Sequence, residues 1–339
     1  MSKPKLLHHG ATLSALNACI CIAVLNIAFF SSSCVTNVAS PEEYYTIGMA
    51  YFELGKYEEA ERWLQRATAA DKTITASEYN LGRIAFERGR YSEAARYFDL
   101  ILSKDPENIM ALKAAAYTKI KQGDLKEAEL LYDRVLAVAP ENADDGYNYA
   151  LVLFAMEKYE ACEEILLKYP FALDDRPDSL LLLARAQDHA DKVEAIDTYD
   201  KWVTGSATAN PVILHEYAKV LEKAELYAKA LEQYQASLEA LKADQENLKK
   251  SALRFNIGRL LLIADSGNPE GIKEIQEAVK EKFDDTEALE ALLDDSRIEE
   301  AAKTEIKKLI EGINAAAKAA TEDDADSDKD DAALQGSGQ

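Results

Sequence analysis

The sequence predicts an all-α protein built from repeated pairs of helices. Three similar segments recur with a 34-residue period: GKYEEAERWL (55 to 64), GRYSEAARYF (89 to 98) and GDLKEAELLY (123 to 132). Small residues recur at the same interval, at Gly48, Gly82, Ala116 and Ala150. Apolar residues within each period are spaced three and four apart, as on one face of an amphipathic helix. A fixed period of this length indicates a repeat array.

Residues 1–33 have the layout of a secretory signal peptide. MSKPKLLHHG carries two lysines and no acid, and the stretch that follows it, from 11 to 30, carries no charge. Three serines then precede Cys34. This ending resembles the lipobox of bacterial lipoproteins, although Ser31 stands where that motif usually has leucine. The resemblance implies that Cys34 is acylated and becomes the new N-terminus.

Two alternatives remain for this segment, which are plain secretion and an uncut membrane span. An uncharged run of this length is long enough to cross a bilayer. If Cys34 is the anchor, residues 34–40 form a short tether to a bacterial membrane. Val35 in place of aspartate resembles lipoproteins sorted to the outer membrane, where the protein would face either the periplasm or the cell surface.

Each repeat from residue 41 onward is predicted to hold two amphipathic helices of about 13 residues. The glycine between them makes the turn, and small residues such as Gly48 and Ala60 allow two backbones to approach. Proline ends the second helix, at Pro106 and Pro140.

This pattern resembles the tetratricopeptide repeat. The matching residues are Tyr44, Ile47, Gly48, Tyr51, Ala60 and Ala67 in the first unit, and Leu81, Gly82, Ala94, Phe98 and Pro106 in the second. The resemblance implies a superhelical solenoid of about seven helix-turn-helix units. Four units occupy 41–176, and about three degenerate units occupy 177–283, after a junction rich in proline and aspartate at 169 to 178.

The chain is expected to end in capping helices and an acidic tail. Helices near 286 to 294 and 296 to 318, within 284–320, would cover the open apolar face of the last repeat. Residues 321–339 contain seven acids against one lysine and no aromatic residue, which predicts a disordered tail.

Composition and charge exclude several classes of function. The formal charge of -22 argues against nucleic-acid binding, because phosphates are held by Lys and Arg. A solvated acidic surface or a basic partner accounts for the charge. Neither a metal site nor a cofactor site is predicted, since the cysteines and histidines lack ligand spacing. Cys162 falls where the repeats have alanine, so we expect a small buried residue there.

No catalytic motif is present, so the sequence does not predict an enzyme. The first helix of each unit instead carries a second stripe, apart from the residues that pack against its own repeat. In the tetratricopeptide family this side of the helix lines a groove that binds peptide segments. The predicted partner-binding residues are, unit by unit, Tyr45, Met49 and Phe52; Tyr79, Arg83 and Phe86; Lys113, Tyr117 and Ile120; and Tyr147, Leu151 and Phe154. Packing between neighbouring units is the alternative role for these side chains.

The sequence therefore predicts an exported, lipid-anchored scaffold that binds protein or peptide segments, with a role in assembling or maintaining the cell envelope. Two alternatives come from other classes. One is a surface-exposed lipoprotein that adheres to host molecules. The other is an enzyme or ligand-binding protein with a pocket in the degenerate repeats at 177–283.

Overall fold

The computed structural model describes the backbone of residues 39–169, 176–206 and 208–335, and side chains as far as residue 319. Within these ranges every regular element is a helix, and the one isolated bridge pairs Gln245 with Leu248. The signal segment 1–33, Cys34 and most of the tether lie outside the described residues, as does most of the junction at 169 to 178.

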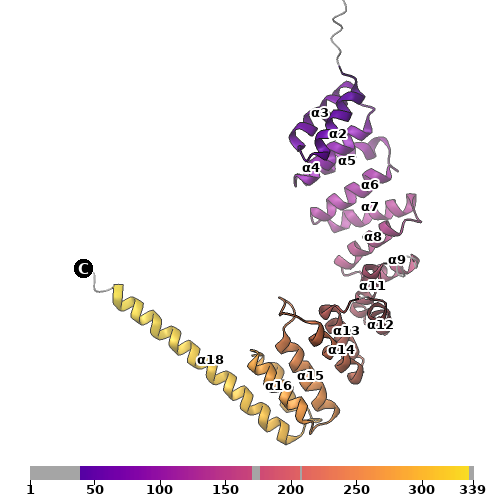
Figure 1. Cartoon of the computed structure of the whole chain (residues 1–339). Helices are drawn as coiled ribbons and strands as arrows, with labels where there is room; N and C mark the ends of the chain where they lie inside the picture. The colour runs from indigo at the N-terminus through magenta and orange to yellow at the C-terminus, as the bar shows by residue number, and fades with distance from the viewer. Residues whose placement is uncertain (1–38, 170–175, 207, 336–339) are drawn as a thin grey trace, which may run out of the picture. The chain divides into compact units, whose positions relative to one another are not determined.

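The chain divides into two compact units, and the first of them ends at Val138. The described residues of this N-terminal unit form three helix pairs (Figure 1). Their bounds are α2 (Pro41–Glu53) with α3 (Tyr57–Ala70), α4 (Thr75–Glu87) with α5 (Tyr91–Lys104), and α6 (Ile109–Lys121) with α7 (Leu125–Val138).

The C-terminal unit begins at Ala139, so the division precedes the fourth repeat and does not fall at the predicted junction. Outside 170–175, 207 and 336–339, it forms four further pairs and two closing helices. The pairs are α8 (Ala143–Ala155) with α9 (Tyr159–Lys168), α11 (Pro177–His189) with α12 (Glu194–Gly205), α13 (Pro211–Lys223) with α14 (Tyr227–Ala240), and α15 (Lys250–Ala264) with α16 (Pro269–Lys280). The closing helices are α17 (Thr286–Asp294) and α18 (Glu300–Gln335).

Polar caps fix where many of the first helices begin. The Ser40 hydroxyl accepts a hydrogen bond from the Glu43 amide (3.2 Å), while the Glu43 carboxylate accepts one from the Ser40 amide (2.8 Å). This reciprocal pair satisfies two amide groups at the start of α2. Asn108 and Asn142 cap α6 and α8, each accepting a hydrogen bond from a backbone amide at 3.1 Å. Side-chain caps therefore recur at the starts of first helices.

Small residues set the distance between the two helices of a pair. A Cβ atom added to Gly48 would lie 2.8 Å from Cγ of Leu64, and one added to Gly82 would lie 2.6 Å from Cε1 of Phe98. These distances are shorter than side-chain contacts allow, so only glycine fits at these two crossings. The equivalent positions of the next four repeats are alanines that are fully buried: Ala116, Ala150, Ala184 and Ala218.

The turn between the two helices of a pair keeps one backbone conformation over six repeats. Gly55, Gly89 and Gly123 have φ of 69°, 71° and 78°. The residues that follow at the same interval have the same left-handed conformation without being glycine: Glu157 (58°), Asp191 (56°) and Glu225 (60°). Residues with a Cβ adopt this conformation at a cost, so the later turns are strained where the early ones are relaxed.

The closing helices cover the last pair, as the sequence predicts. Ile275 and Ala278 of α16 form one apolar cluster with Leu289 of α17 and with Ile306 and Ile310 of α18. The chain after residue 320 differs from expectation, because α18 continues as a single helix to Gln335 where the sequence predicts a disordered tail (Figure 1). The segment NAAAKAA at 314 to 320 explains the continuation, since alanine and lysine are strong helix formers.

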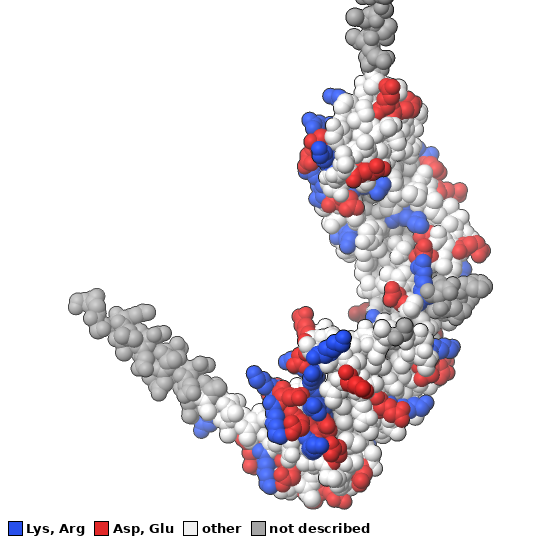
Figure 2. Space-filling view, in the orientation of Figure 1, with Lys and Arg blue, Asp and Glu red and all other residues white. Residues whose placement is uncertain are grey.

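None of the helices in the described ranges is both long enough and apolar enough to cross a bilayer. The uncharged run at 11 to 30 lies outside these ranges. On the face visible in Figure 2, acidic and basic side chains are intermingled over both units.

Candidate functional site

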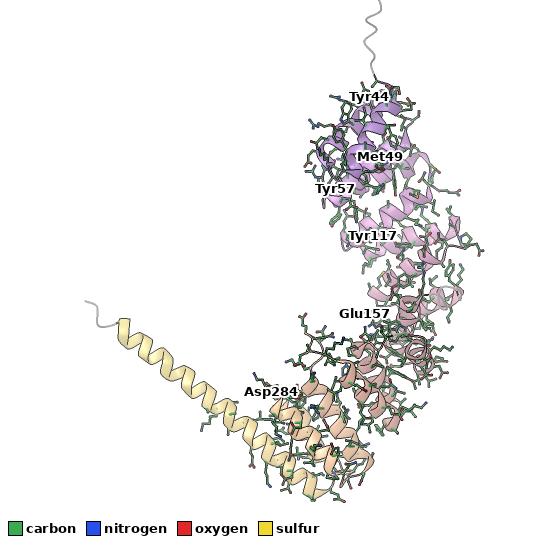
Figure 3. All side chains as sticks on the ribbon, viewed as in Figure 1. Tyr44, Met49, Tyr57, Tyr117, Glu157 and Asp284 are labelled. Carbon is green, nitrogen blue, oxygen red and sulfur yellow. The ribbon has the colours of Figure 1, made fainter. Side chains whose placement is uncertain are left out.

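The predicted stripe lies on first helices and belongs to two separate units. In the N-terminal unit α2 carries Tyr45, Met49 and Phe52, α4 carries Tyr79, Arg83 and Phe86, and α6 carries Lys113, Tyr117 and Ile120. We call these nine residues the first-helix stripe. Figure 3 labels Met49 and Tyr117 on α2 and α6. Tyr147, Leu151 and Phe154 lie on α8 in the C-terminal unit and are described separately.

Within the stripe, the last residue of one helix contacts the middle residue of the next. The guanidinium of Arg83 lies 4.6 Å from the ring centroid of Phe52. One repeat later, the Phe86 and Tyr117 rings lie 5.2 Å apart at an interplanar angle of 33°. The two pairs have the same separation in the sequence. Distances of this size allow cation-π and tilted ring interactions, so the stripe is a connected ladder in the N-terminal unit.

Tyrosines at the start of the second helices extend this ladder, and the sequence prediction missed them. Phe52 lies 5.8 Å from Tyr57, and Phe86 lies 5.3 Å from Tyr91. Each phenylalanine thus lies between a tyrosine of its own repeat and a residue of the following one. The signal was present in the sequence, because tyrosine follows the turn in GKY, GRY and EKY, at residues 57, 91 and 159.

Hydrogen bonds hold the beginning of the ladder. The Asn80 side-chain amide donates to the Tyr45 hydroxyl at 3.3 Å and to the backbone carbonyl of Ala76 at 2.8 Å. Its carbonyl oxygen accepts from Nη1 of Arg83 at 3.1 Å. Asn80 therefore positions the Arg83 guanidinium over Phe52. Because Asn80 is buried, the network is shielded from water on one side.

The ladder is partly open to solvent. Tyr117 is 47% exposed, and the ammonium of Lys121 lies 5.3 Å from its ring centroid. Met49, Phe52, Arg83, Phe86, Lys113 and Ile120 are half-buried. Tyr79 is also half-buried, and its ring lies 5.8 Å from that of Phe98, so it packs within its own repeat. The arrangement combines an accessible ring, Tyr117, which has Lys121 beside it, with a held cation, Arg83, over Phe52.

The three positions on α8 form a second aromatic group in the C-terminal unit. Phe154 lies 5.3 Å from Tyr159 and 5.6 Å from His189, and Tyr159 stacks on His189 at 4.7 Å. Leu151 is 41% exposed. Burial raises the pKa of Tyr147, and the nearby carboxylate of Asp178 adds to this. His189 contacts Phe154 from the next first helix, but it lies four residues beyond Arg185, which is the position equivalent to Arg83 and Tyr117.

Cys162 is fully buried, as the repeat register predicts. Burial raises the pKa of its thiol to about 12, and the neighbouring Glu163 carboxylate contributes to this. A thiol in this state is protonated at neutral pH and is a poor nucleophile. In the described part of the chain, no three His, Cys, Asp or Glu side chains are grouped so that they could hold a metal ion.

The fold and the ladder define the class of the protein as an all-α helical-repeat protein. Family models agree with this class. Residues 45–109 and 85–144 each match a model described as tetratricopeptide repeat. Residues 121–202 match a model described as anaphase-promoting complex, cyclosome, subunit 3. Residues 45–144 are therefore similar to tetratricopeptide repeats, and the predicted fold class is confirmed.

Solved structures with a similar fold have low sequence identity. A tetratricopeptide repeat protein from Parabacteroides merdae ATCC 43184 is 17% identical, with a TM-score of 0.48, and the match covers 74% of this chain and 97% of that one. The MamA RS-1 ArsTM double mutant is 19% identical, with a TM-score of 0.46, over 49% of this chain and 93% of that one. The first repeat domain of Spaghetti (RPAP3), bound to the HSP90 peptide SRMEEVD, is 21% identical, with a TM-score of 0.33, over 34% and 93%. No curated protein matches the sequence.

Proposed function

We propose that the protein is a scaffold that binds a segment of another protein along the first-helix stripe of the N-terminal unit. The observation that carries this proposal is the pair Phe86 and Tyr117, in which one ring is packed and the other is 47% exposed. A half-exposed tyrosine held by a neighbouring ring offers a rigid apolar surface with a polar tip. Such residues dominate the energetics of protein interfaces.

The cations beside the rings add selectivity for the bound segment. Arg83 is held over Phe52 by Asn80, and Lys121 lies over Tyr117. A peptide that places an apolar side chain between the rings could direct its backbone carbonyls or a carboxylate toward these two cations. Side chains fixed before binding lose little conformational entropy when the partner arrives. A tetratricopeptide unit with these features suits capture of a peptide.

A photo-crosslinking experiment tests the site. A benzophenone amino acid replaces Tyr117 in one variant and Leu130 in a control; Leu130 lies on a second helix and is 58% exposed. We expect crosslinks to defined partner proteins from position 117 and few from position 130. Arg83→Ala in the same background should reduce the crosslinks from position 117. Equal crosslinking from both positions, or no effect of Arg83→Ala, would place the partner elsewhere.

We also propose that the scaffold is exported and tethered to a bacterial membrane through Cys34, where it serves assembly or maintenance of the cell envelope. The sequence context of Cys34 and the short spacing to α2 support this, because only six residues separate Cys34 from Pro41. The tether then reaches about 20 Å when it is extended. The stripe would be presented close to the lipid surface.

The anchor is tested by Cys34→Ala. This variant should lose fatty-acid labelling and move from the membrane fraction to the soluble fraction. Cys162→Ala is the matched control, since Cys162 is buried and should leave both readouts unchanged. Retention of the Cys34→Ala variant in the membrane with an intact signal segment would favour an uncut span.

A further inference from the structure

A polar cleft in the C-terminal unit has a composition opposite to that of the chain. The cleft has a volume of about 570 Å³ and lies among α13, α14 and α15. Its lining includes four basic side chains, Lys219, Lys223, Arg259 and Arg297, and only one acidic side chain, Glu222. The whole chain has a formal charge of -22. Figure 2 shows Lys and Arg gathered beside acids on the visible face of this unit.

Glu222 neutralises one of the four cations and orients it. Both carboxylate oxygens of Glu222 accept hydrogen bonds from Nη2 of Arg259 at 2.6 Å. Nη2 also lies 3.4 Å from the side-chain oxygen of Asn256. Among the described residues no hydrogen bond uses Nε or Nη1 of Arg259. The guanidinium is therefore fixed at one nitrogen and has donors left for a ligand.

Of the other three cations, one has no acidic partner among the described residues and two pair with acids that do not line the cleft. Lys219 has no acidic partner within the described part of the chain. Lys223 pairs with Asp188 (3.6 Å) and with Asp191, and neither of these acids lines the cleft. Arg297 pairs with Asp295 at 2.7 Å and lies over the Tyr227 ring at 5.5 Å. The cleft therefore combines the unpaired ammonium of Lys219 with two cations that are positioned by acids outside the cleft lining.

His215 gives the cleft a neutral hydrogen-bonding group. It is half-buried and its ring lies 5.6 Å from that of Tyr234. Burial lowers the pKa of His215, Lys219 lowers it further, and Glu216 and Glu222 oppose this effect. The imidazole can accept or donate one hydrogen bond without carrying a charge of its own.

We propose that this cleft is a binding site for a small ligand that carries two or more oxyanion groups, as phosphate or carboxylate. Arg and Lys are the side chains that recognise these groups, and Arg259 is held in a fixed orientation that favours such recognition. The volume lies within the range of small-molecule sites. The site is separate from the first-helix stripe and goes beyond scaffold binding. It would let a charged metabolite bind to the unit that does not carry the stripe.

Calorimetric titration of the protein at low ionic strength tests the proposal, with pyrophosphate and citrate as probes. We expect saturable binding of at least one probe. Binding of pyrophosphate alone would assign a phosphate ligand, and binding of citrate alone a carboxylate ligand. Lys219→Ala should weaken binding about tenfold, as expected for one charge-assisted contact, and Lys219→Glu should weaken it more.

A charge-matched variant separates the cleft from a general effect of net charge. Lys229→Glu changes the charge by the same amount on the exposed side of α14, outside the cleft lining, and should bind as the wild type does. Arg297→Gln removes another cation of the cleft lining and should also weaken binding. The proposal is overturned if neither probe binds, or if Lys219→Glu and Lys229→Glu have equal effects. Neither result would affect crosslinking at Tyr117, which tests the scaffold function.

Discussion

The guanidinium of Arg83 lies 4.6 Å from the ring centroid of Phe52, which belongs to the preceding repeat. The contact joins α2 to α4, and Phe86 and Tyr117 make the corresponding contact between α4 and α6. Stacked repeats draw much of their stability from the interfaces between neighbours. The same side chains that we propose as a peptide-binding surface therefore also hold the repeats in register.

A double-mutant cycle on Phe52 and Arg83 measures this dual role. We expect Phe52→Ala and Arg83→Ala to be coupled by about 0.5–1 kcal/mol in the free energy of unfolding, as for a partly exposed cation-π pair. Urea denaturation of the four proteins gives the value. A coupling energy indistinguishable from zero would mean that the two side chains do not interact in solution, and Arg83 would then be available to a partner.

The strained turns give a second prediction. Glu157→Gly should raise the free energy of unfolding by about 1 kcal/mol, because glycine removes the cost of a Cβ in the left-handed conformation. Figure 3 labels Glu157 at its turn, where φ is 58°. Gly89→Ala is the converse change at the equivalent turn, where φ is 71°, and should lower stability by a similar amount. A decrease in stability for Glu157→Gly would show that the glutamate side chain has stabilising contacts that outweigh the strain.

The glycines inside helices should respond in opposite directions to alanine. Gly82→Ala puts a Cβ 2.6 Å from Phe98 and should destabilise the protein by about 1–3 kcal/mol. Gly312→Ala puts a Cβ into open space in α18, with nothing within 4 Å, and should stabilise that helix by about 0.5–1 kcal/mol. Circular dichroism during thermal unfolding distinguishes the two. Equal effects would mean that the α4 and α5 backbones can separate at no cost.

Acidification should destabilise the C-terminal unit through His215. Burial holds the pKa of this imidazole below its ordinary value of 6.5, so the unfolded chain binds the proton more tightly than the folded one. The free energy of unfolding therefore falls as the pH drops through 6.5, and the contribution is fully present above that value. Lys219 strengthens this effect and Glu216 and Glu222 weaken it.

The measurement compares melting temperatures at about pH 7.5 and about pH 5.5 for the wild type and His215→Gln. Carboxylates that titrate in both proteins cancel in the difference. We expect the wild type to lose more stability than the variant does. An equal loss in both proteins would show that His215 is solvated in the folded state.

The sequence was sufficient to predict the helix pairs and their small-residue crossings, since a fixed 34-residue period is a direct record of repeated packing. It also predicted that the stripe positions lie on first helices. It did not predict the contact of Phe52 with Arg83 or the place of Asn80 in the network, because both depend on how one repeat sits on the next. The helical segment after residue 320 was missed because composition argued for disorder while the alanines before it favour helix.

The sequence offered a pocket in the degenerate repeats at 177–283 as an alternative, but it did not predict which residues line the cleft. Lys219 and Arg259 lie on different repeats, and the 34-residue register is lost between α14 and α15. Individual Lys and Arg residues could not be singled out from the sequence, because the chain has 39 basic and 61 acidic residues. Ala184 and Ala218, by contrast, follow Ala150 with the same period as the earlier small residues. The sequence alone could therefore have shown that the 34-residue register continues to Ala218.

The three glycine turns lie in the N-terminal unit, and the three turns that use Glu157, Asp191 and Glu225 lie in the C-terminal unit. In a repeat array local instability is felt by adjacent repeats and fades with distance. We therefore expect thermal opening to begin among α8 to α14 before it reaches α2 to α7. We therefore expect heat or denaturant to disrupt the unit with the proposed anion cleft before the unit with the proposed peptide-binding stripe.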